Sequence, residues 1–200
     1  MKFLKKSYYE IISVDNLLEA WREFVKGKKK KNDVQLFSIS LMENIFRLNT
    51  DLMDYTYKHS GYQEFSICDP KPRNIHKAVV RDRLLHHAIH KVLYPFFDKF
   101  FITDSFSCRI DKGIHKAIKK FEENTRQASR NNTKTCWVLK CDIKKFFDSV
   151  DHEILIKILK QKILDLDILW LLGEVIESFN KQSSQLSLFD LRTDANRERE

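Results

Sequence analysis

The feature that most constrains the fold is a short apolar run that ends in a carboxylate. Residues 137–141 read Trp-Val-Leu-Lys-Cys, and Asp142 follows directly, ahead of two lysines, two phenylalanines and Asp148. The run predicts a short buried strand. A carboxylate at the end of such a strand is costly unless it is paired or holds a cation. Asp142 is therefore a candidate metal ligand, and the alternative is that it caps the helical turn that follows.

Composition favours a helix-rich globular chain with a basic surface. The 200 residues are 42% hydrophobic and include only 4 Gly and 3 Pro, which disfavours a turn-rich β-sandwich. The net charge of +8 suits a polyanionic partner, although a merely soluble basic surface would give the same value. We find no secretory signal, no apolar run long enough to cross a membrane and no paired zinc cysteines, so we expect a cytoplasmic protein with reduced thiols and no membrane partner.

Hydrophobic periodicity predicts mostly helices with a few strands, which is an α+β chain. The longest predicted helix before the first strands covers residues 33–56, with an inner stripe of apolar side chains. That stripe comprises Leu36, Ile39, Met42, Ile45 and Phe46. The remaining predicted elements are helices over 14–26, 81–101, 115–128, 151–163 and 167–180, and strands over 62–67, 74–79 and 137–141.

A second group of chemically suggestive residues lies at the predicted turn between two strands. The turn reads Pro70-Lys71-Pro72-Arg73, and Arg81-Asp82-Arg83 follows at the start of the next helix. A hairpin tip that carries Lys and Arg can fold over a triphosphate, because Arg offers a donor fork and Lys a point charge. The alternative for the Arg-Asp-Arg run is an ion-pair network at a helix N-terminus.

A third group precedes the helix predicted over 115–128. Ser105, Arg109 and Lys112 lie in a polar loop, where such side chains commonly contact nucleic-acid phosphates without reading sequence. The equally weighted alternative is that Ser105 and Arg109 brace the surrounding structure. Three histidines at 86, 87 and 90 lack the companion residues of a zinc site, so we interpret them as solvated or hydrogen-bonded side chains.

Taken together and in order, these three blocks resemble bacterial reverse transcriptases of the group II intron, retron and diversity-generating kind. The resembling part covers roughly residues 55–180. It implies a right-hand polymerase fold, here incomplete, with helix-rich fingers and the beginning of the palm. The implied division is an N-terminal helical extension over 1–54, fingers over 55–134, the start of the palm over 135–185 and an irregular tail over 186–200.

The resemblance also implies roles for individual residues. Asp142 would be the catalytic aspartate that bridges two Mg²⁺ ions, with the backbone carbonyl of Ile143 as a further metal ligand. The incoming dNTP would be held by Lys71, Arg73, Arg81 and Phe147, with Arg83 as an alternative to Arg81. RNA template and primer would be contacted by Ser105, Arg109 and Lys112. A cognate structured RNA is a further implied partner.

One departure from the family pattern changes what this chain alone is expected to do. Reverse transcriptases carry a later [YF]-x-D-D motif that supplies another metal-binding aspartate, and this sequence contains no Asp-Asp pair. We therefore expect a polymerase chain cut before the second catalytic motif and inactive by itself. The alternatives are a maturase-like RNA-binding module that does not synthesise DNA, or an inactive remnant.

Overall fold

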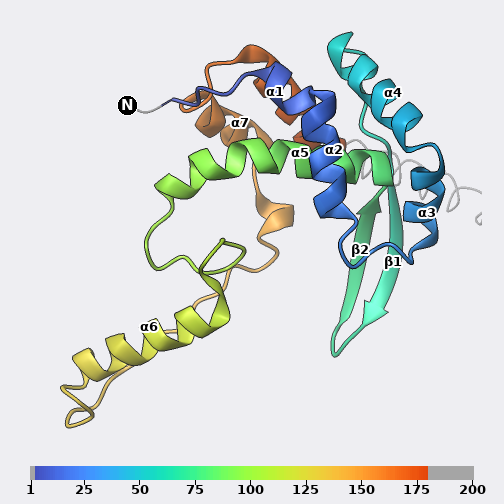
Figure 1. Cartoon of the computed structure of the whole chain (residues 1–200). Helices are drawn as coiled ribbons and strands as arrows, with labels where there is room; N and C mark the ends of the chain where they lie inside the picture. Colours follow the sequence, from blue (N-terminus) through green and yellow to red (C-terminus); the bar gives the residue numbers. More distant parts are fainter. Residues whose placement is uncertain (1–2, 180–200) are drawn as a thin grey trace, which may run out of the picture. The chain divides into compact units, whose positions relative to one another are not determined.

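The computed structural model describes residues 3–179, which divide into two compact units (Figure 1). The first unit comprises Met1–Leu93 and Asp151–Glu200, and the second comprises Tyr94–Val150. The elements are α1 (Tyr8–Ile12), α2 (Val14–Phe24), α3 (Asn32–Ile39), α4 (Leu41–Met53), β1 (Tyr62–Cys68), β2 (Pro72–Ala78), α5 (Val80–Phe97), η1 (Asp98–Phe100), α6 (Gly113–Ala128), η2 (Phe147–Ser149) and α7 (His152–Lys160). A further helical segment spans 166–179. The mixture of helices with a two-stranded sheet is the α+β class that the sequence predicts.

The first unit is built around a helical core. Side chains of α1, α2, α4 and α5 supply most of the fully buried apolar residues, and the segment after α7 adds more. Two long-range hydrogen bonds of Tyr8 join these parts: its hydroxyl donates to the Leu52 carbonyl at 2.8 Å, and its amide donates to Asp165 at 3.0 Å. The chain therefore returns after residue 151 to complete the core that the N-terminal helices begin.

The helix predicted over 33–56 is two helices, and its predicted inner stripe is wrong. Ser40 separates α3 from α4 with non-helical backbone angles, and serine competes for backbone hydrogen bonds in a way that disfavours helix interiors. The break gives each helix its own inner face, so the stripe is not continuous. Of its members only Ile45 is buried, while Leu36, Ile39, Met42 and Phe46 are exposed.

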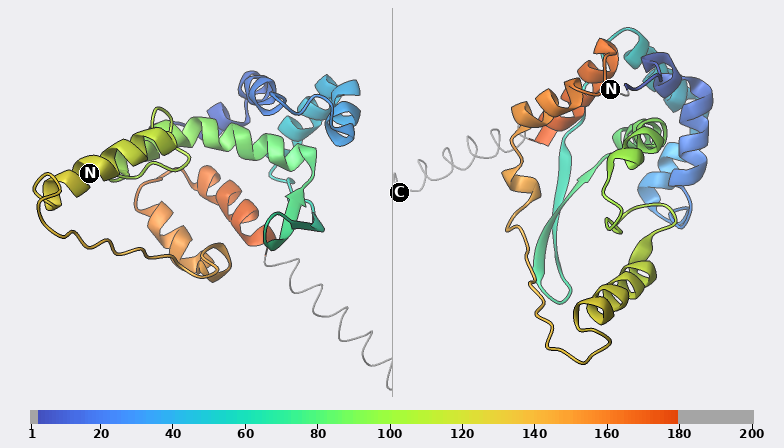
Figure 2. Two further views of the ribbon diagram at one scale, coloured as in Figure 1. Left: turned by 90° about the horizontal axis from the view of Figure 1, so that it is seen from below. Right: turned by 90° about the vertical axis from the view of Figure 1, so that its left-hand side faces the viewer.

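The predicted hairpin is confirmed as an antiparallel pair, in which Tyr62 lies opposite Ala78 and Cys68 opposite Pro72. It extends from the helices as a long ribbon (Figure 2). At its base β2 leads directly into α5, whose buried face includes Leu84, Leu85 and Ala88. The hairpin and the helix that follows it are thus one continuous piece of structure, with a buried base and an exposed tip.

The second unit has little packing of its own. It contains the end of α5, η1, α6 and η2, and no apolar side chain between Tyr94 and Val150 is buried among the residues that the structure describes. The strand predicted over 137–141 is wrong: these residues are irregular, and Trp137 is 91% exposed. A strand needs a neighbour to pair its backbone N–H and C=O groups, and among the described residues β1 and β2 pair only with each other. Within 3–179, no helix has the length and apolar character to cross a membrane.

Candidate functional site

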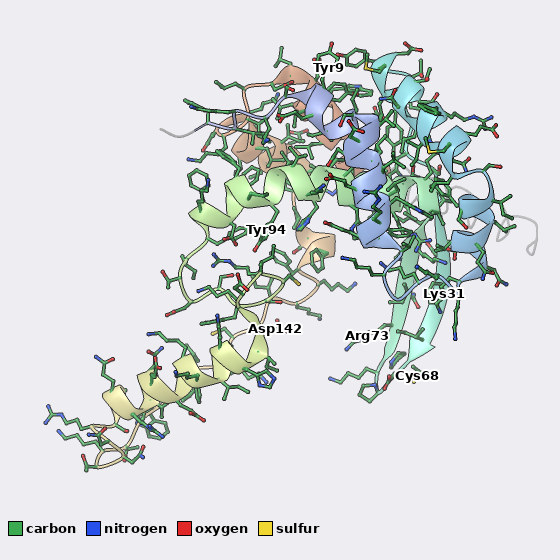
Figure 3. All side chains as sticks on the ribbon, viewed as in Figure 1. Tyr9, Lys31, Cys68, Arg73, Tyr94 and Asp142 are labelled. Atoms are coloured by element: carbon green, nitrogen blue, oxygen red, sulfur yellow. The ribbon has the colours of Figure 1, made fainter. Side chains whose placement is uncertain are left out.

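The hairpin tip presents two of the predicted nucleotide-binding cations to solvent. Lys71 lies in the turn, and Arg73 is the second residue of β2, opposite Ile67. Both are exposed, and neither makes a hydrogen bond or ion pair with another described residue. Figure 3 shows Arg73 and Cys68 at the free end of the ribbon. The tip therefore carries uncommitted positive charge, which is what a hairpin that closes on an anion requires.

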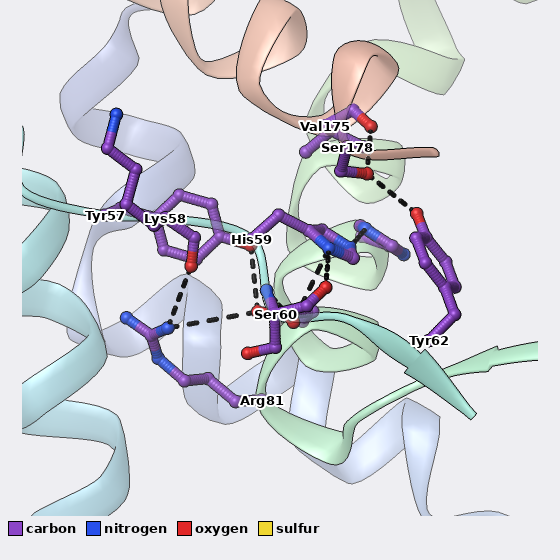
Figure 4. A network of polar contacts seen from close by, with 10 residues as sticks. Tyr57, Lys58, His59, Ser60, Tyr62, Arg81, Val175 and Ser178 are labelled. Carbon is purple, nitrogen blue, oxygen red and sulfur yellow. Dashed lines mark hydrogen bonds and ion pairs between the residues drawn. The ribbon is translucent and has the colours of Figure 1, made fainter. Parts of the chain in front are cut away.

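The base of the hairpin is held by a buried carboxylate, Asp82, on the first turn of α5. It is fully buried and accepts hydrogen bonds from the Tyr57 hydroxyl and the Ser60 amide, both at 2.9 Å (Figure 4). The His59 ring nitrogen Nδ1 lies 3.7 Å from the same carboxylate. Burial and the neighbouring Asp82 raise the pKa of the Tyr57 hydroxyl, so it stays a proton donor. Asp82 thereby fixes the segment that leads into β1.

Two stacked histidines extend this network. The rings of His59 and His86 lie 5.2 Å apart at 15°, and their Nε2 atoms are 3.2 Å apart. Burial, and then the neighbouring His59, lower the pKa of His86 to about 4. His86 is therefore neutral at neutral pH, and its Nε2 atom lies within hydrogen-bond distance of the His59 ring. The contact confirms the interpretation of His86 as a hydrogen-bonded histidine.

On its other side His59 stacks on Tyr62, the first residue of β1, at 5.0 Å. The Tyr62 hydroxyl lies 2.8 Å from the Ser178 hydroxyl, and Phe179 packs edge-on against Tyr62 and His76. The helical segment 166–179 therefore supports one face of the hairpin near its base (Figure 4). Arg73 and Lys77 lie on the opposite face, since they alternate with His76 along β2.

The arginines that flank Asp82 are already engaged. Arg81 pairs with Asp51 at 2.6 Å and stacks over the Tyr57 ring at 4.8 Å. Arg83 pairs with Asp33 at 2.6 Å. The ion-pair interpretation of the Arg-Asp-Arg run is thus confirmed. Arg81 lies 3.9 Å from Asp82 within the run, and the shorter pairs are made with α3 and α4. Neither guanidinium is as free as that of Arg73.

Asp33 joins the hairpin to the N-terminal helices as well. It accepts Lys77 of β2 and Arg83 of α5, each at 2.6 Å. Lys77 is the main cause of the lowered pKa of this carboxyl, with Arg83 adding to it. Asp33 therefore bridges α3 to the hairpin and to α5.

In the second unit, Arg109 is the centre of a loop. Its guanidinium donates to the Asp98 carboxylate at 2.7 Å, to the Asp98 carbonyl at 3.1 Å and to the Ile102 and Ser105 carbonyls at 2.9 and 3.2 Å. The Lys112 ammonium donates to the Thr103 carbonyl at 2.8 Å. These contacts favour the bracing alternative for Ser105 and Arg109. The contacts of all three residues with RNA stay a prediction.

Asp142 lies in exposed, irregular chain. It makes no hydrogen bond or ion pair with another described residue, so the predicted cap is not formed. Ile143 is 65% exposed, and Phe147, in η2, is 86% exposed. The oxygen donors of Asp142 and Ile143 fit Mg²⁺ in kind, but two hard cations need more oxygen ligands than these residues provide. Among the described residues, no three His, Cys, Asp or Glu side chains gather as a metal site.

The sequence interpretation missed the residues that hold the hairpin base. Tyr57, His59 and Asp33 were not singled out, and Asp82 was treated only as part of a charge run. A signal existed for Asp82, because helical spacing places it on the same side as Leu85 and Ile89, which are buried. No comparable signal marks Tyr57 and His59, since they lie in irregular chain.

Comparison with known proteins identifies the class. Residues 58–189, about two thirds of the chain, match the reverse transcriptase (RNA-dependent DNA polymerase) family. The matched part contains the hairpin, the Arg109 loop and Asp142. The chain belongs to the reverse transcriptase family.

Two curated relatives resemble half of the chain. Protein YkfC of Escherichia coli is 27% identical over 99 residues, which cover 50% of this chain and 26% of that protein. An uncharacterized 91 kDa protein in the cob intron of Schizosaccharomyces pombe is 28% identical over 98 residues, which cover 49% of this chain and 11% of that protein. The chain thus matches far less than two thirds of the length of either relative.

Proposed function

We propose that this chain forms the fingers and the beginning of the palm of an RNA-directed DNA polymerase. The reaction would transfer a nucleotide from a dNTP to a primer 3′-hydroxyl on an RNA template. The observation that carries the proposal is the family match, which includes every residue assigned to nucleotide, metal or template. The proposed fingers cover 55–134 and the start of the palm 135–185, after a helical extension over 1–54 and before a tail over 186–200.

In this proposal the hairpin supplies the nucleotide clamp. Lys71 and Arg73 would contact the triphosphate, because both are exposed and lack protein partners at the tip. Arg81 is instead a positioning residue, since its pair with Asp51 and its stack on Tyr57 hold the hairpin base. Phe147 would pack against the sugar of the bound nucleotide. Ser105, Arg109 and Lys112 would position the template and primer.

Asp142 and the Ile143 carbonyl would each contribute a metal ligand, in a site that other carboxylates must complete. Bound Mg²⁺ stabilises the charge that develops during phosphoryl transfer. Because Asp142 by itself is one carboxylate, we propose that residues 1–200 alone extend a primer poorly or not at all. The activity therefore belongs to the whole product of the natural gene that carries this sequence.

Primer extension by that gene product on an RNA template, with dNTPs and Mg²⁺, tests the proposal. We expect Asp142→Ala to lower the rate roughly a thousandfold, because a metal supplies several kcal/mol of charge stabilisation and about 1.4 kcal/mol corresponds to a factor of ten. Glu122→Ala, which removes another exposed carboxylate of the same unit, is the matched control and should extend normally. Extension that survives Asp142→Ala would contradict the catalytic assignment.

A second candidate function is RNA binding without synthesis. It is favoured by the charge of the second unit, in which residues 94–150 contain 12 Lys and Arg against 7 Asp and Glu. RNA binding by a gene product that never extends a primer on any template would support this alternative and exclude the polymerase.

A further inference from the structure

Four lysines line one hollow in the second unit, and we call them the lysine face: Lys112, Lys116, Lys119 and Lys120. Their spacing of four, seven and eight residues from Lys112 places them along one side of α6. The hollow measures about 340 Å³ and is closed on its other side by Thr103, Asp104 and Phe106. Its lining therefore comes entirely from one unit.

The charge of the lysine face is only partly neutralised. The Lys112 and Lys116 ammonium groups donate to the backbone carbonyls of Thr103 and Asp111, at 2.8 and 2.6 Å, and a carbonyl carries no formal charge. The ammonium groups of Lys119 and Lys120 make no hydrogen bond or ion pair with any residue that the structure describes. Two carboxylates, Asp104 and Glu123, line the same hollow, so four cations face two anions.

The opposite side of α6 is apolar. Ile114, Ile118 and Phe121 lie about half a turn around the helix from the lysine face and are exposed by 70%, 50% and 54%. An amphipathic helix packs through its apolar side. Whatever covers that side, the lysine face then points away from it and stays open to solvent.

The chemistry of this surface fits a phosphate backbone. Lysine is a compact point charge that contacts phosphates without the planar fork used to read base edges. From Lys112 to Lys120 the surface extends about 12 Å along α6, since a helix rises about 1.5 Å per residue. That length suits successive phosphates of one strand better than a single small anion.

We propose that the lysine face binds the sugar-phosphate backbone of RNA, independently of sequence. This proposal rests on the proposed function only for its choice of RNA as the polyanion. It adds Lys116, Lys119 and Lys120, none of which the motifs point to, as RNA contacts.

The test measures binding of a fluorescein-labelled RNA stem–loop to the 200-residue chain by fluorescence anisotropy over a salt series. The variant Lys116→Gln, Lys119→Gln, Lys120→Gln keeps good helix formers on α6. We expect its affinity to fall at least tenfold at about 0.1 M salt, and the slope of log K against log salt to shrink by about 2 to 3, because each lost phosphate contact removes nearly one unit.

A matched triple variant separates a local site from bulk charge. Lys5→Gln, Lys157→Gln and Lys160→Gln remove the same charge from exposed positions of the first unit and should leave the slope nearly unchanged. Equal losses of RNA affinity in both triple variants would overturn the proposal. It would also be overturned if the α6 variant lost binding to anionic lipid vesicles but kept its affinity for the stem–loop. Circular dichroism confirms that each variant is folded.

The outcome is independent of catalysis. Asp142→Ala should bind the stem–loop as the wild type does, because Asp142 is remote from the lysine face in sequence and is not part of its hollow. If the 200-residue chain binds RNA through the lysine face but the whole gene product never extends a primer, the polymerase is refuted and this site still stands. If the gene product extends primers and the α6 variant binds RNA as the wild type does, the polymerase stands and the lysine face is refuted.

Discussion

The two units differ in how they hold the residues that the family motifs mark. In the first, Arg81 and Arg83 each have a carboxylate partner. The buried Asp82 between them holds the segment that leads into β1. In the second, Asp142 lies in exposed chain without a partner, and no apolar side chain is buried among the described residues. The first unit is therefore organised by its own core, whereas the segment around Asp142 in the second is not.

This difference shows that one motif block can be structurally complete while the next is not. The residues that support the hairpin all belong to the first unit, either before residue 94 or in the returning segment 151–179. Within the described residues, the segment that ends in Asp142 is irregular and pairs with no strand. Substitutions at the base of the hairpin should accordingly act on stability, and substitution of Asp142 should act on chemistry.

The sharpest test of this contrast compares two aspartates. Asp82→Ala leaves the Tyr57 hydroxyl and the Ser60 amide without their acceptor, and each donor left unsatisfied costs about 1–3 kcal/mol of unfolding free energy. Asp142→Ala removes no contact and should unfold as the wild type does. Urea unfolding followed by circular dichroism measures both. Equal stability of the two variants would break the comparison.

The next test uses the buried histidine pair. The pKa of His86 is lowered to about 4 by burial and by His59, so between pH 6.5 and 4 the unfolded chain binds a proton that the folded chain does not. Stability should therefore fall as the pH drops through this window, by up to about 3 kcal/mol from this group. Denaturant unfolding at pH 7 and at pH 4.5 measures the loss.

His86→Phe is the matched variant for that measurement. It keeps an aromatic ring stacked on His59 but carries no titratable nitrogen. The other ionisable groups near His86 are His59, His87 and Asp82, and they remain in place. We expect a shallower pH dependence in the variant than in the wild type. Identical profiles would show that His86 is not the group that titrates.

A smaller effect should separate the tip of the hairpin from its base. Arg73→Ala removes an exposed guanidinium and should raise the KM for dNTP tenfold to a hundredfold, since a charge-assisted hydrogen bond contributes about 1.5–3 kcal/mol. Its unfolding should be unchanged. Arg81→Ala should instead lower stability, because it breaks the pair with Asp51. A stability loss in Arg73→Ala with normal nucleotide kinetics would reverse these roles.

The sequence predicted the first unit better than the second. The hairpin and α5 were predicted, because turn residues and helical period are local signals. Ser40 was not recognised as a helix break, since tertiary packing selects which of several serines ends a helix. The strand over 137–141 failed because a strand depends on a partner that local sequence does not supply.

The candidate site was predictable to a similar extent. Chemistry and spacing pointed to Lys71, Arg73 and Asp142, but not to the partners that hold Arg81 and Arg83. Those partners, Asp51 and Asp33, lie 30 and 50 residues away, and only the fold brings them close. Long-range pairing of this kind leaves no periodic trace in the sequence.

The smallest predicted effect concerns the ordered loop of the second unit. Hydrogen bonds from Arg109 and Tyr94 lower the pKa of the Asp98 carboxyl, so its contribution to loop order is full above the ordinary carboxyl pKa and is lost as the pH falls through the lowered value. Asp98→Asn should remove that pH dependence. Because Asp98 and Arg109 are only partly buried and solvent screens their pair, the change should be local. The amide of Ile110, which donates to the Tyr94 hydroxyl at 2.8 Å, reports on the order of this loop.

Hydrogen exchange at the Ile110 amide should accelerate in Asp98→Asn at neutral pH, while the amides of α5 in the first unit exchange as in the wild type. Acceleration throughout both units would mean that the loop and the core of the first unit unfold together, which would contradict the proposed difference between the units.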